Sequence, residues 1–268
     1  MDQPSSESTR SENSKFTLEI CIDNWDSAKA AIDGGANRLE VCSALGLGGL
    51  TPTRGLLIKI RDYLSQKPKT VHVAAMIRSR PGDFVYSSDE IDLMKMEIET
   101  LHDVCDSFVF GCLKVTANGE VTLEENHCRI LVTACGSKPA TFHRAIDVCS
   151  NPEVTCVDII SLGFKRILTS GGAATALKGI EMIKSLQASY GDKITIMVGS
   201  GVNASNVPQI YEATKVLDYH SSCSSEHVSS IDSICGQIFP SGVSKWQITD
   251  IEKVIAMKKI IQEIEKQN

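Results

Sequence analysis

Short apolar, β-rich runs alternate along the chain with stretches whose apolar positions repeat at helical spacing. Eight such runs predict eight strands, at residues 18–21, 39–42, 71–77, 108–113, 140–143, 166–168, 194–198 and 216–220. Because helical patterns separate the strands, we expect an α/β fold whose parallel strands close into a TIM (β/α)8 barrel. A doubly wound open sheet is the alternative. It normally has a glycine-rich turn after the first strand, and here that turn is Asp23-Asn24.

Several helix starts are marked by residues that cap helices. Ser87 and Glu90 have the spacing of a capping box, in which a hydroxyl and a carboxylate bind free N–H groups of the first turn. The same spacing, or a proline at a first helical position, marks three further starts, at Thr51-Pro52, at Thr122 with Glu125 and at Thr249 with Glu252. These signals place helices between the predicted strands and after the last one.

The composition limits where the protein acts and what it binds. The chain has 268 residues, and we expect one barrel domain at 16–268 after a disordered, polar tail at 1–15. A formal net charge of −6 argues against nucleic acid or an anionic membrane as a partner. The tail lacks the apolar core of a signal peptide, and no apolar run approaches the roughly 20 residues of a membrane span. We therefore expect a cytoplasmic protein, with the nucleus as a further location.

Two of the ten cysteines stand apart from the others. The ten are scattered without a C-x-x-C pair, which disfavours structural zinc and predicts free thiols in a reducing compartment. Two belong to a repeated Leu-Glu-x-Cys pattern, Glu19 with Cys21 and Glu40 with Cys42. Side chains alternate faces along a strand, so each glutamate shares a face with its cysteine. With equivalent positions level on neighbouring strands, two thiolates can share one soft ion such as Cu(I).

Polar residues gather at the carboxyl ends of the predicted strands, where a barrel has its active site. Arg78 and His143 have the parity that points into this mouth, and we expect Arg78 to be the first partner of the two glutamates. The loops Ser170-Gly171-Gly172 and Gly199-Ser200-Gly201 precede helices, where free N–H groups can hold a phosphate or carboxylate. Each feature also has a structural explanation, because Arg pairs with structural carboxylates, His satisfies buried hydrogen bonds and glycines serve tight turns.

Several segments resemble the CutC copper homeostasis family, within a match that runs from Leu18 to about Ser222. They are RLEVCS at 38–43, GGLTP at 48–52, MIRSRPGDF at 76–84, FG at 110–111, TFHRAID at 141–147 and RILTSG at 166–171. The resemblance implies a TIM barrel that assembles into oligomers and is linked to copper tolerance. As in animal members, it also implies Cu(I) binding by the cysteines that fall at Cys21 and Cys42. It does not specify a reaction.

Three functions stay open from the sequence. The first is Cu(I) binding or buffering, with Cys21 and Cys42 as metal ligands and Met76 as a weak third. The second is an enzyme acting on a small phosphorylated or carboxylated metabolite by acid/base chemistry, so whether the chain is an enzyme stays open. The third is an oligomeric scaffold.

The enzyme hypothesis has its own candidate residues. Its catalytic candidates are Glu19, Glu40, His143 and Asp147, the last of which lies in one of the CutC-like segments. Its anion-binding candidates are Arg78, Ser170, Gly171, Gly172, Gly199, Ser200 and Gly201. The expected partners are thus a copper ion, a small anionic metabolite and further copies of the chain in a homodimer or homotetramer.

Overall fold

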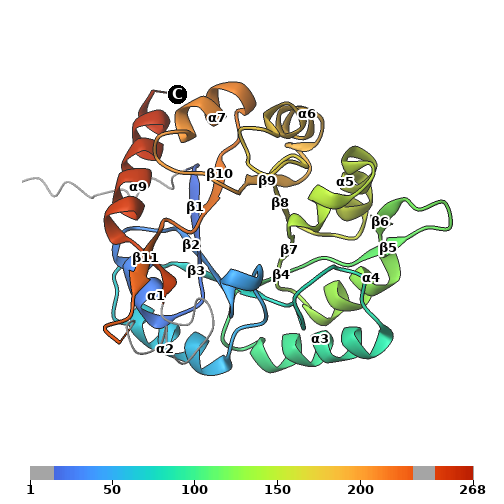
Figure 1. Ribbon diagram of the computed structural model, residues 1–268, viewed down its shortest axis with the longest axis horizontal. Helices are drawn as coiled ribbons and strands as arrows, with labels where there is room; N and C mark the ends of the chain where they lie inside the picture. Colours follow the sequence, from blue (N-terminus) through green and yellow to red (C-terminus); the bar gives the residue numbers. More distant parts are fainter. Residues whose placement is uncertain (1–14, 232–244, 268) are drawn as a thin grey trace, which may run out of the picture.

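Eight parallel strands close into a barrel in the computed structural model, which describes residues 15–231 and 245–267 (Figure 1). Around the barrel the order is β1-β10-β9-β8-β7-β4-β3-β2. The strands are β1 (Thr17–Ile22), β2 (Arg38–Val41), β3 (His72–Met76), β4 (Ser107–Phe110), β7 (Ala140–Phe142), β8 (Arg166–Thr169), β9 (Thr195–Val198) and β10 (Asp218–Ser221). The predicted TIM barrel is confirmed. The predicted tail, apart from Lys15, lies outside the described residues.

Helices connect successive strands and cover the outside of the barrel (Figure 1). They are α1 (Trp25–Asp33), α2 (Arg54–Leu64), α3 (Ser88–Leu101), α4 (Glu125–Ala134), α5 (Pro152–Ser161), α6 (Ile180–Tyr190), α7 (Val207–Thr214) and α9 (Ile251–Lys266), with short 3-10 helices η1 (Leu45–Leu47) and η2 (Arg144–Val148). None of the helices in the described part of the chain is both long and apolar enough to span a bilayer.

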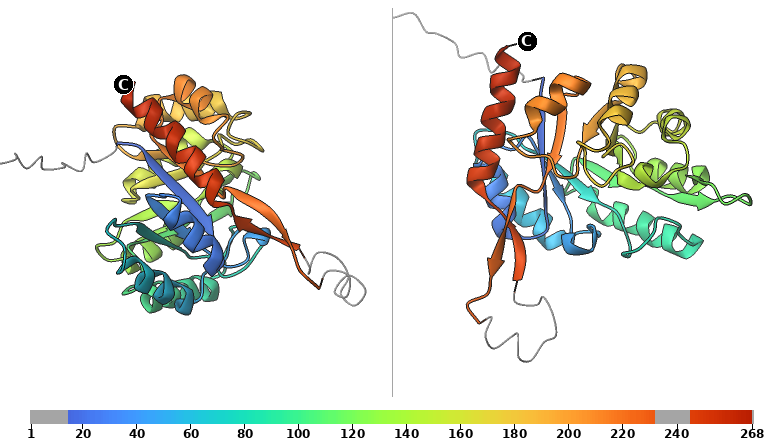
Figure 2. Two further views of the ribbon diagram at one scale, coloured as in Figure 1. Left: turned by 90° about the vertical axis from the view of Figure 1, so that its left-hand side faces the viewer. Right: turned by 45° about the horizontal axis from the view of Figure 1, so that its top comes forward.

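Two antiparallel hairpins lie outside the barrel, and the sequence pattern does not predict them. One pairs β5 (Leu113–Val115) with β6 (Val121–Leu123), and the other pairs β11 (Ser224–Val228) with β12 (Lys245–Thr249). The β11–β12 hairpin extends away from the barrel (Figure 2). Most residues of these strands are exposed or only partly buried, so the strands lack the apolar signal that marks those of the barrel.

Barrel strands bury both of their faces, but in different surroundings. In β1, Leu18, Ile20 and Ile22 belong to the main apolar core, which lies between strands and helices. Glu19 and Cys21 have the opposite parity and point into the barrel. A second, smaller apolar cluster lies in the interior that the strands enclose, and it consists of Cys42, Ala74, Met76 and Val109. The interior is therefore a mixture of apolar, sulfur and charged side chains.

The register of the first two strands offsets the two Leu-Glu-x-Cys patterns. Cys21 lies opposite Glu40, and Glu19 lies opposite Arg38. The expectation that Cys21 and Cys42 lie level is therefore wrong, because Cys42 lies two residues, about 6.6 Å, further toward the mouth. The physical reason is that strands tilt and shift relative to one another when a sheet closes into a barrel.

The helix starts agree with the capping signals only in part. Ser87 and Glu90 form the predicted capping box at α3. Helix α2 is capped by Thr53, two residues after Thr51. Thr122 belongs to strand β6, so Glu124 caps α4 instead, and Asp250 takes the place expected for Thr249 at α9. The polar side chain nearest the first free N–H groups makes the cap, which a spacing rule alone does not identify.

Candidate functional site

A cavity of about 210 Å³ opens at the carboxyl ends of the strands, and we call it the mouth cavity. The polar and sulfur-bearing side chains among its lining residues are Cys21, Glu40, Met76, His143, Arg144 and His220. A second cavity of about 700 Å³ lies beside the β11–β12 hairpin, and Cys21 also lines it. Cys21 is partly exposed and so is accessible from both spaces.

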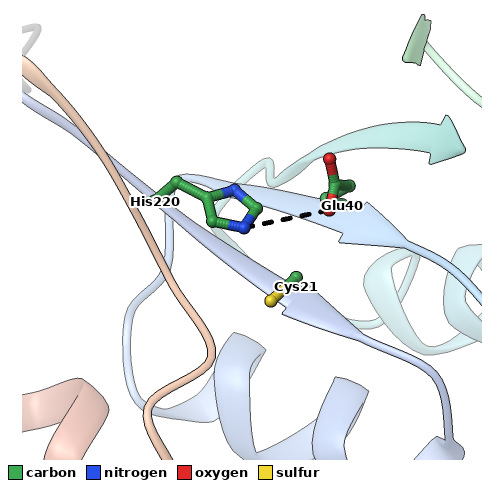
Figure 3. A group of neighbouring side chains, drawn as sticks. All are labelled: Cys21, Glu40 and His220. Atoms are coloured by element: carbon green, nitrogen blue, oxygen red, sulfur yellow. Dashed lines mark ion pairs between the residues drawn. The ribbon is translucent and has the colours of Figure 1, made fainter. Parts of the chain in front are cut away.

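Three potential ligand atoms converge at one side of the mouth cavity. They belong to Cys21 on β1, Glu40 on β2 and His220 on β10, and all lie within 4.8 Å of one another (Figure 3). His220 Nε2 is 3.9 Å from Glu40 Oε2. Strands β10 and β1 are adjacent only because the barrel closes, and Glu19 lies opposite His220 in their register. His220 was not a predicted site residue, and its only sequence signal is its place at a strand end.

Glu19 is held by two positively charged neighbours. Its Oε1 accepts a hydrogen bond from His220 Nδ1 at 2.7 Å, and its Oε2 accepts one from Arg38. Arg38 also donates to Asp218 Oδ1 at 2.6 Å, and all three side chains are buried. Burial alone would raise the pKa of Glu19, but the charges of Arg38 and His220 outweigh it and hold that pKa well below its usual range. The expected partner Arg78 is therefore wrong for Glu19.

Glu40 has a different environment from Glu19. Its Oε2 accepts a hydrogen bond from the Cys42 thiol at 3.6 Å, whereas Oε1 is buried without a hydrogen-bond partner among the described residues. Burial, with a contribution from the charge of Glu19, raises the pKa of Glu40 to about 7. Burial opposes the charged form of His220, but Cys21, Glu40 and Glu19 raise the pKa of this histidine well above its usual value.

Cys42 is fully buried in the apolar cluster that includes Met76, and only Met76 of these two lines the mouth cavity. Burial, followed by the charges of Glu40 and Cys21, raises the pKa of its thiol well above the usual value. Cys21 donates weakly to the carbonyl of Ser221 at 3.7 Å. Cys21 thus lines the mouth cavity and belongs to the group with Glu40 and His220, whereas Cys42 packs with Met76, one of the lining residues of that cavity.

Arg78 forms its hydrogen bonds with the loops around the mouth. Its guanidinium donates to the carbonyls of Leu47, Gly49 and Gly82, at 3.2, 3.3 and 2.7 Å. It also lies 4.9 Å from the ring centre of Phe84, a cation–π distance. Arg78 therefore connects two loops, and neither Glu19 nor Glu40 is among its hydrogen-bond or ion-pair partners.

His143 lines the mouth cavity with an uncharged imidazole. Its Nδ1 accepts a hydrogen bond from the Ala145 N–H at 3.3 Å, and its Nε2 is buried with no hydrogen-bond partner among the described residues. Burial, helped by the nearby charge of Arg78, lowers the pKa of His143 to about 3. The ring is therefore neutral at pH 7, with one nitrogen not yet used by the protein.

Asp147 binds the loop that was predicted to hold an external anion. Its carboxylate accepts from the N–H groups of Ser170 at 3.0 Å and Gly172 at 3.1 Å, and from the hydroxyls of Thr169 and Ser170 at 2.5 and 2.9 Å. Arg144 completes this network through a 2.8 Å contact to Asp147. The loop therefore does bind an anionic group, but that group is the carboxylate of Asp147 and not an external ligand.

The second glycine-rich loop, Gly199-Ser200-Gly201, follows β9. Ser200 and Gly201 have φ angles of 74° and 72°. Both lie in the left-handed region, which glycine adopts freely and serine does not. The Ser200 hydroxyl donates to the carbonyl of Ala174 at 2.8 Å, so its side chain joins this loop to the one after β8.

The sequence of this chain is similar to those of one known protein family. The model of the CutC family matches residues 16–225. The chain belongs to the CutC family. It is 44% identical over 218 residues to the copper homeostasis protein cutC homolog of Caenorhabditis elegans, covering 81% of this chain and 84% of that one. A family protein CutC from Glaesserella parasuis is also 44% identical over 218 residues, with 81% and 86% covered.

A solved structure supports the same assignment. The putative copper homeostasis protein CutC from Streptococcus agalactiae superposes with a TM-score of 0.71 at 32% identity. The match covers 77% of this chain and 98% of that one. The sequence match and the barrel fold of this chain thus agree in placing it in the CutC family.

Proposed function

We propose that this CutC protein binds Cu(I) at the mouth of its barrel through the thiolates of Cys21 and Cys42, and so buffers intracellular copper. The observation that carries the proposal is that Cys21 lines the mouth cavity from β1, while Cys42, which directly follows the neighbouring strand β2, packs with Met76, another lining residue of that cavity. Thiolates are soft ligands that favour Cu(I), and a thioether is a weaker ligand of the same kind. Met76 lines the mouth cavity and packs with Cys42, so it can serve as that weak third ligand.

The strand register sets the geometry of this site. The two thiols lie diagonally across β1 and β2, so the side chains must turn toward each other to hold one ion. Cys21 is partly exposed and its thiol makes only a weak hydrogen bond to Ser221, which leaves it free to turn. Metal binding requires the thiols to lose their protons, so the affinity is expected to rise with pH.

A competition titration tests the proposal. Anaerobic apoprotein competes with a chromophoric chelator for Cu(I), and Cys21→Ser and Cys42→Ser are compared with Cys128→Ser. Cys128 is a suitable control because it is as buried as Cys42 but lies on α4, where its thiol donates to the Cys112 carbonyl. We expect the first two variants to lose tight binding and the control to keep it. Equal losses in all three variants would exclude the two-thiolate site.

The mouth cavity supports a second candidate, an enzyme acting on a small phosphorylated or carboxylated metabolite. Glu40 Oε1 and His143 Nε2 both lack hydrogen-bond partners in the described residues, and both side chains line the same cavity. Such atoms are suited to bind a substrate or to move a proton. In this enzyme Glu19 positions His220, and Arg78 holds the loops around the mouth. Asp147 holds the first glycine-rich loop, and Ser200 joins the second loop to it. Arg144 and His220 are the positively charged side chains among the lining residues of this cavity, and Arg144 also pairs with Asp147.

A thermal-shift screen with inorganic phosphate, sugar phosphates and small carboxylates tests this second function. A ligand at about 100 times its Kd raises the free energy of unfolding by roughly 2.7 kcal/mol. We expect Arg144→Ala to remove the shift and Arg129→Ala, which changes an exposed arginine on α4, to retain it. If no compound shifts the wild-type protein, the enzyme hypothesis loses its support.

We also propose a cytoplasmic location, with the nucleus as a further one, and assembly into a homodimer or homotetramer. The nine cysteines within the described ranges are all free thiols, which supports a reducing compartment. Cell fractionation and light scattering of the purified protein test the two statements separately.

A further inference from the structure

We propose that Cys21, Glu40 and His220 form a metal site of their own, for a divalent ion of Zn²⁺ type, which shares only Cys21 with the Cu(I) pair. Sulfur, carboxylate oxygen and imidazole nitrogen are the three kinds of ligand that proteins use for Zn²⁺. This inference does not depend on Cu(I) binding, because two of its three ligands belong to neither the Cu(I) pair nor its weak third ligand.

The three ligand atoms are already close to the required spacing. All lie within 4.8 Å of one another, and His220 Nε2 is 3.9 Å from Glu40 Oε2 (Figure 3). Around a tetrahedral ion with bonds of about 2.0–2.3 Å, ligand atoms lie roughly 3.3–3.8 Å apart. Side-chain movements of less than about 1.5 Å therefore close the site without any change in the strands.

His220 is oriented as a metal ligand. Its Nδ1 lies 2.7 Å from Glu19 Oε1, and Arg38 fixes the other oxygen of Glu19. When a metal displaces the proton on Nε2, the carboxylate keeps the other proton on Nδ1 and directs Nε2 toward the metal, as is usual for metal-binding histidines. The Nε2 atom consequently faces Cys21 and Glu40.

The environment of Glu40 is a second, independent observation that supports a bound cation. The residue is 3% exposed, and its Oε1 is buried without a hydrogen-bond partner in the described part of the chain. A buried polar atom left unpaired is unfavourable. The oxygen that faces His220 is Oε2, so a cation bound by both carboxylate oxygens of Glu40 would remove the penalty at Oε1.

The fourth coordination position would face the mouth cavity. That cavity of about 210 Å³ is wide enough for water or a small molecule. Three protein ligands and one open position are characteristic of zinc sites that bind or activate a ligand, whereas structural zinc sites are closed by four protein ligands. The site is therefore built to present its ion to a small molecule in the mouth.

Co²⁺ is the first probe, because its complexes with thiolates absorb in the near ultraviolet and so report the sulfur ligand directly. Apoprotein titrated with Co²⁺ should develop this band, and Zn²⁺ should displace it. Cys21→Ala should abolish the band, whereas Cys42→Ala should retain it. Cys21→Ala leaves the buried charges of Glu19, Arg38 and His220 in place, so the variant is expected to fold. A band that survives in Cys21→Ala overturns the proposal.

Zn²⁺ affinity, measured by competition with a chromophoric chelator, tests the other two ligands. Glu40→Gln and His220→Asn should weaken binding by more than about 100-fold, and Glu19→Gln by about 10- to 100-fold. Glu97→Gln and His102→Asn are matched controls, since both residues lie elsewhere and bind Thr51 and the Cys135 carbonyl. Equal affinities in the ligand variants and the controls contradict the site.

The two metal sites can fail independently. In the Cu(I) competition, Glu40→Gln should keep its affinity and Cys42→Ser should lose it. In the Zn²⁺ competition, Glu40→Gln should lose its affinity and Cys42→Ser should keep it. If Cys42→Ser keeps Cu(I), the proposed function fails while the Zn²⁺ result still decides the inference. If Glu40→Gln keeps Zn²⁺, the inference fails while the Cu(I) result still decides the function.

Discussion

His220 Nδ1 lies 2.7 Å from Glu19 Oε1, although 201 positions separate the two residues in the chain. The contact joins the last barrel strand to the first, so it exists only when the barrel is closed. Because Arg38 binds the other oxygen of Glu19, this carboxylate is fully engaged. Glu19 therefore positions His220 and is not a free base.

Arg38 should be essential to the stability of the barrel. It is the cation between two buried carboxylates, Glu19 and Asp218. Replacement by Met retains much of the volume but leaves both carboxylates without this partner. We expect Arg38→Met to lower the free energy of unfolding in urea by about 3–5 kcal/mol, the usual effect of breaking a buried ion pair.

The matched control is Arg54→Met, which breaks an ion pair with Asp103 on the surface. Exposed pairs contribute about 1 kcal/mol or less. Two variants with the same small effect would show that the interior of the barrel is open to solvent and that the network contributes little.

His143 should make the protein less stable at mildly acidic pH. Its pKa is about 3 in the folded state, below the value of about 6.5 in an unfolded chain. As the pH falls from 6.5 toward 3, the unfolded chain takes up a proton that the folded protein does not, so stability decreases. For this one group, the free energy of unfolding falls by up to about 1.4 kcal/mol for each pH unit.

Urea unfolding at a series of pH values from 7.5 to about 4.5 measures this effect. Wild type and His143→Gln are compared, and the wild type should lose more stability than the variant below about pH 6.5. Parallel pH profiles for the two proteins would mean that His143 accepts a proton in the folded state.

Asp147 should prevent external anions from binding the loop after β8. Asp147→Ala removes the acceptor for the N–H groups of Ser170 and Gly172. We expect a loss of about 1–3 kcal/mol, because the N–H of buried Ser170 is left unpaired, whereas exposed Gly172 can bind water. Inorganic phosphate should then raise the thermal midpoint of Asp147→Ala more than that of wild type or of Asp83→Ala, a control at an exposed ion pair. Identical phosphate responses in all three proteins would argue against this anion site.

The barrel could be predicted from the sequence because its strands carry a strong local signal. Runs such as Leu18, Ile20 and Ile22 are apolar and fully buried, and they recur with helices between them. The hairpins were missed for the opposite reason. Strand β11, Ser224–Val228, is polar and mostly exposed, so only its pairing with β12 defines it.

Strand parity was the only part of the site geometry that the sequence could predict. Parity places Glu19, Cys21 and Glu40 on the interior face, but it does not give their heights. The two-residue offset between β1 and β2 gives Glu19 the partner Arg38 in place of Arg78. His220 could not be assigned to Cys21 without knowing that β10 closes against β1. Register and closure depend on the whole barrel, and no local pattern contains them.

X-ray absorption at the copper edge of the Cu(I)-loaded protein is the decisive measurement for copper binding, because it identifies the atoms bound to the ion. We expect two sulfur atoms at short distance, from Cys21 and Cys42, with Met76 as a more distant third. We also expect Cys42→Ser to lose one of the two short sulfur contacts, whereas Cys128→Ser keeps both. A wild-type spectrum dominated by nitrogen and oxygen, or one that Cys42→Ser leaves unchanged, would contradict the two-thiolate site.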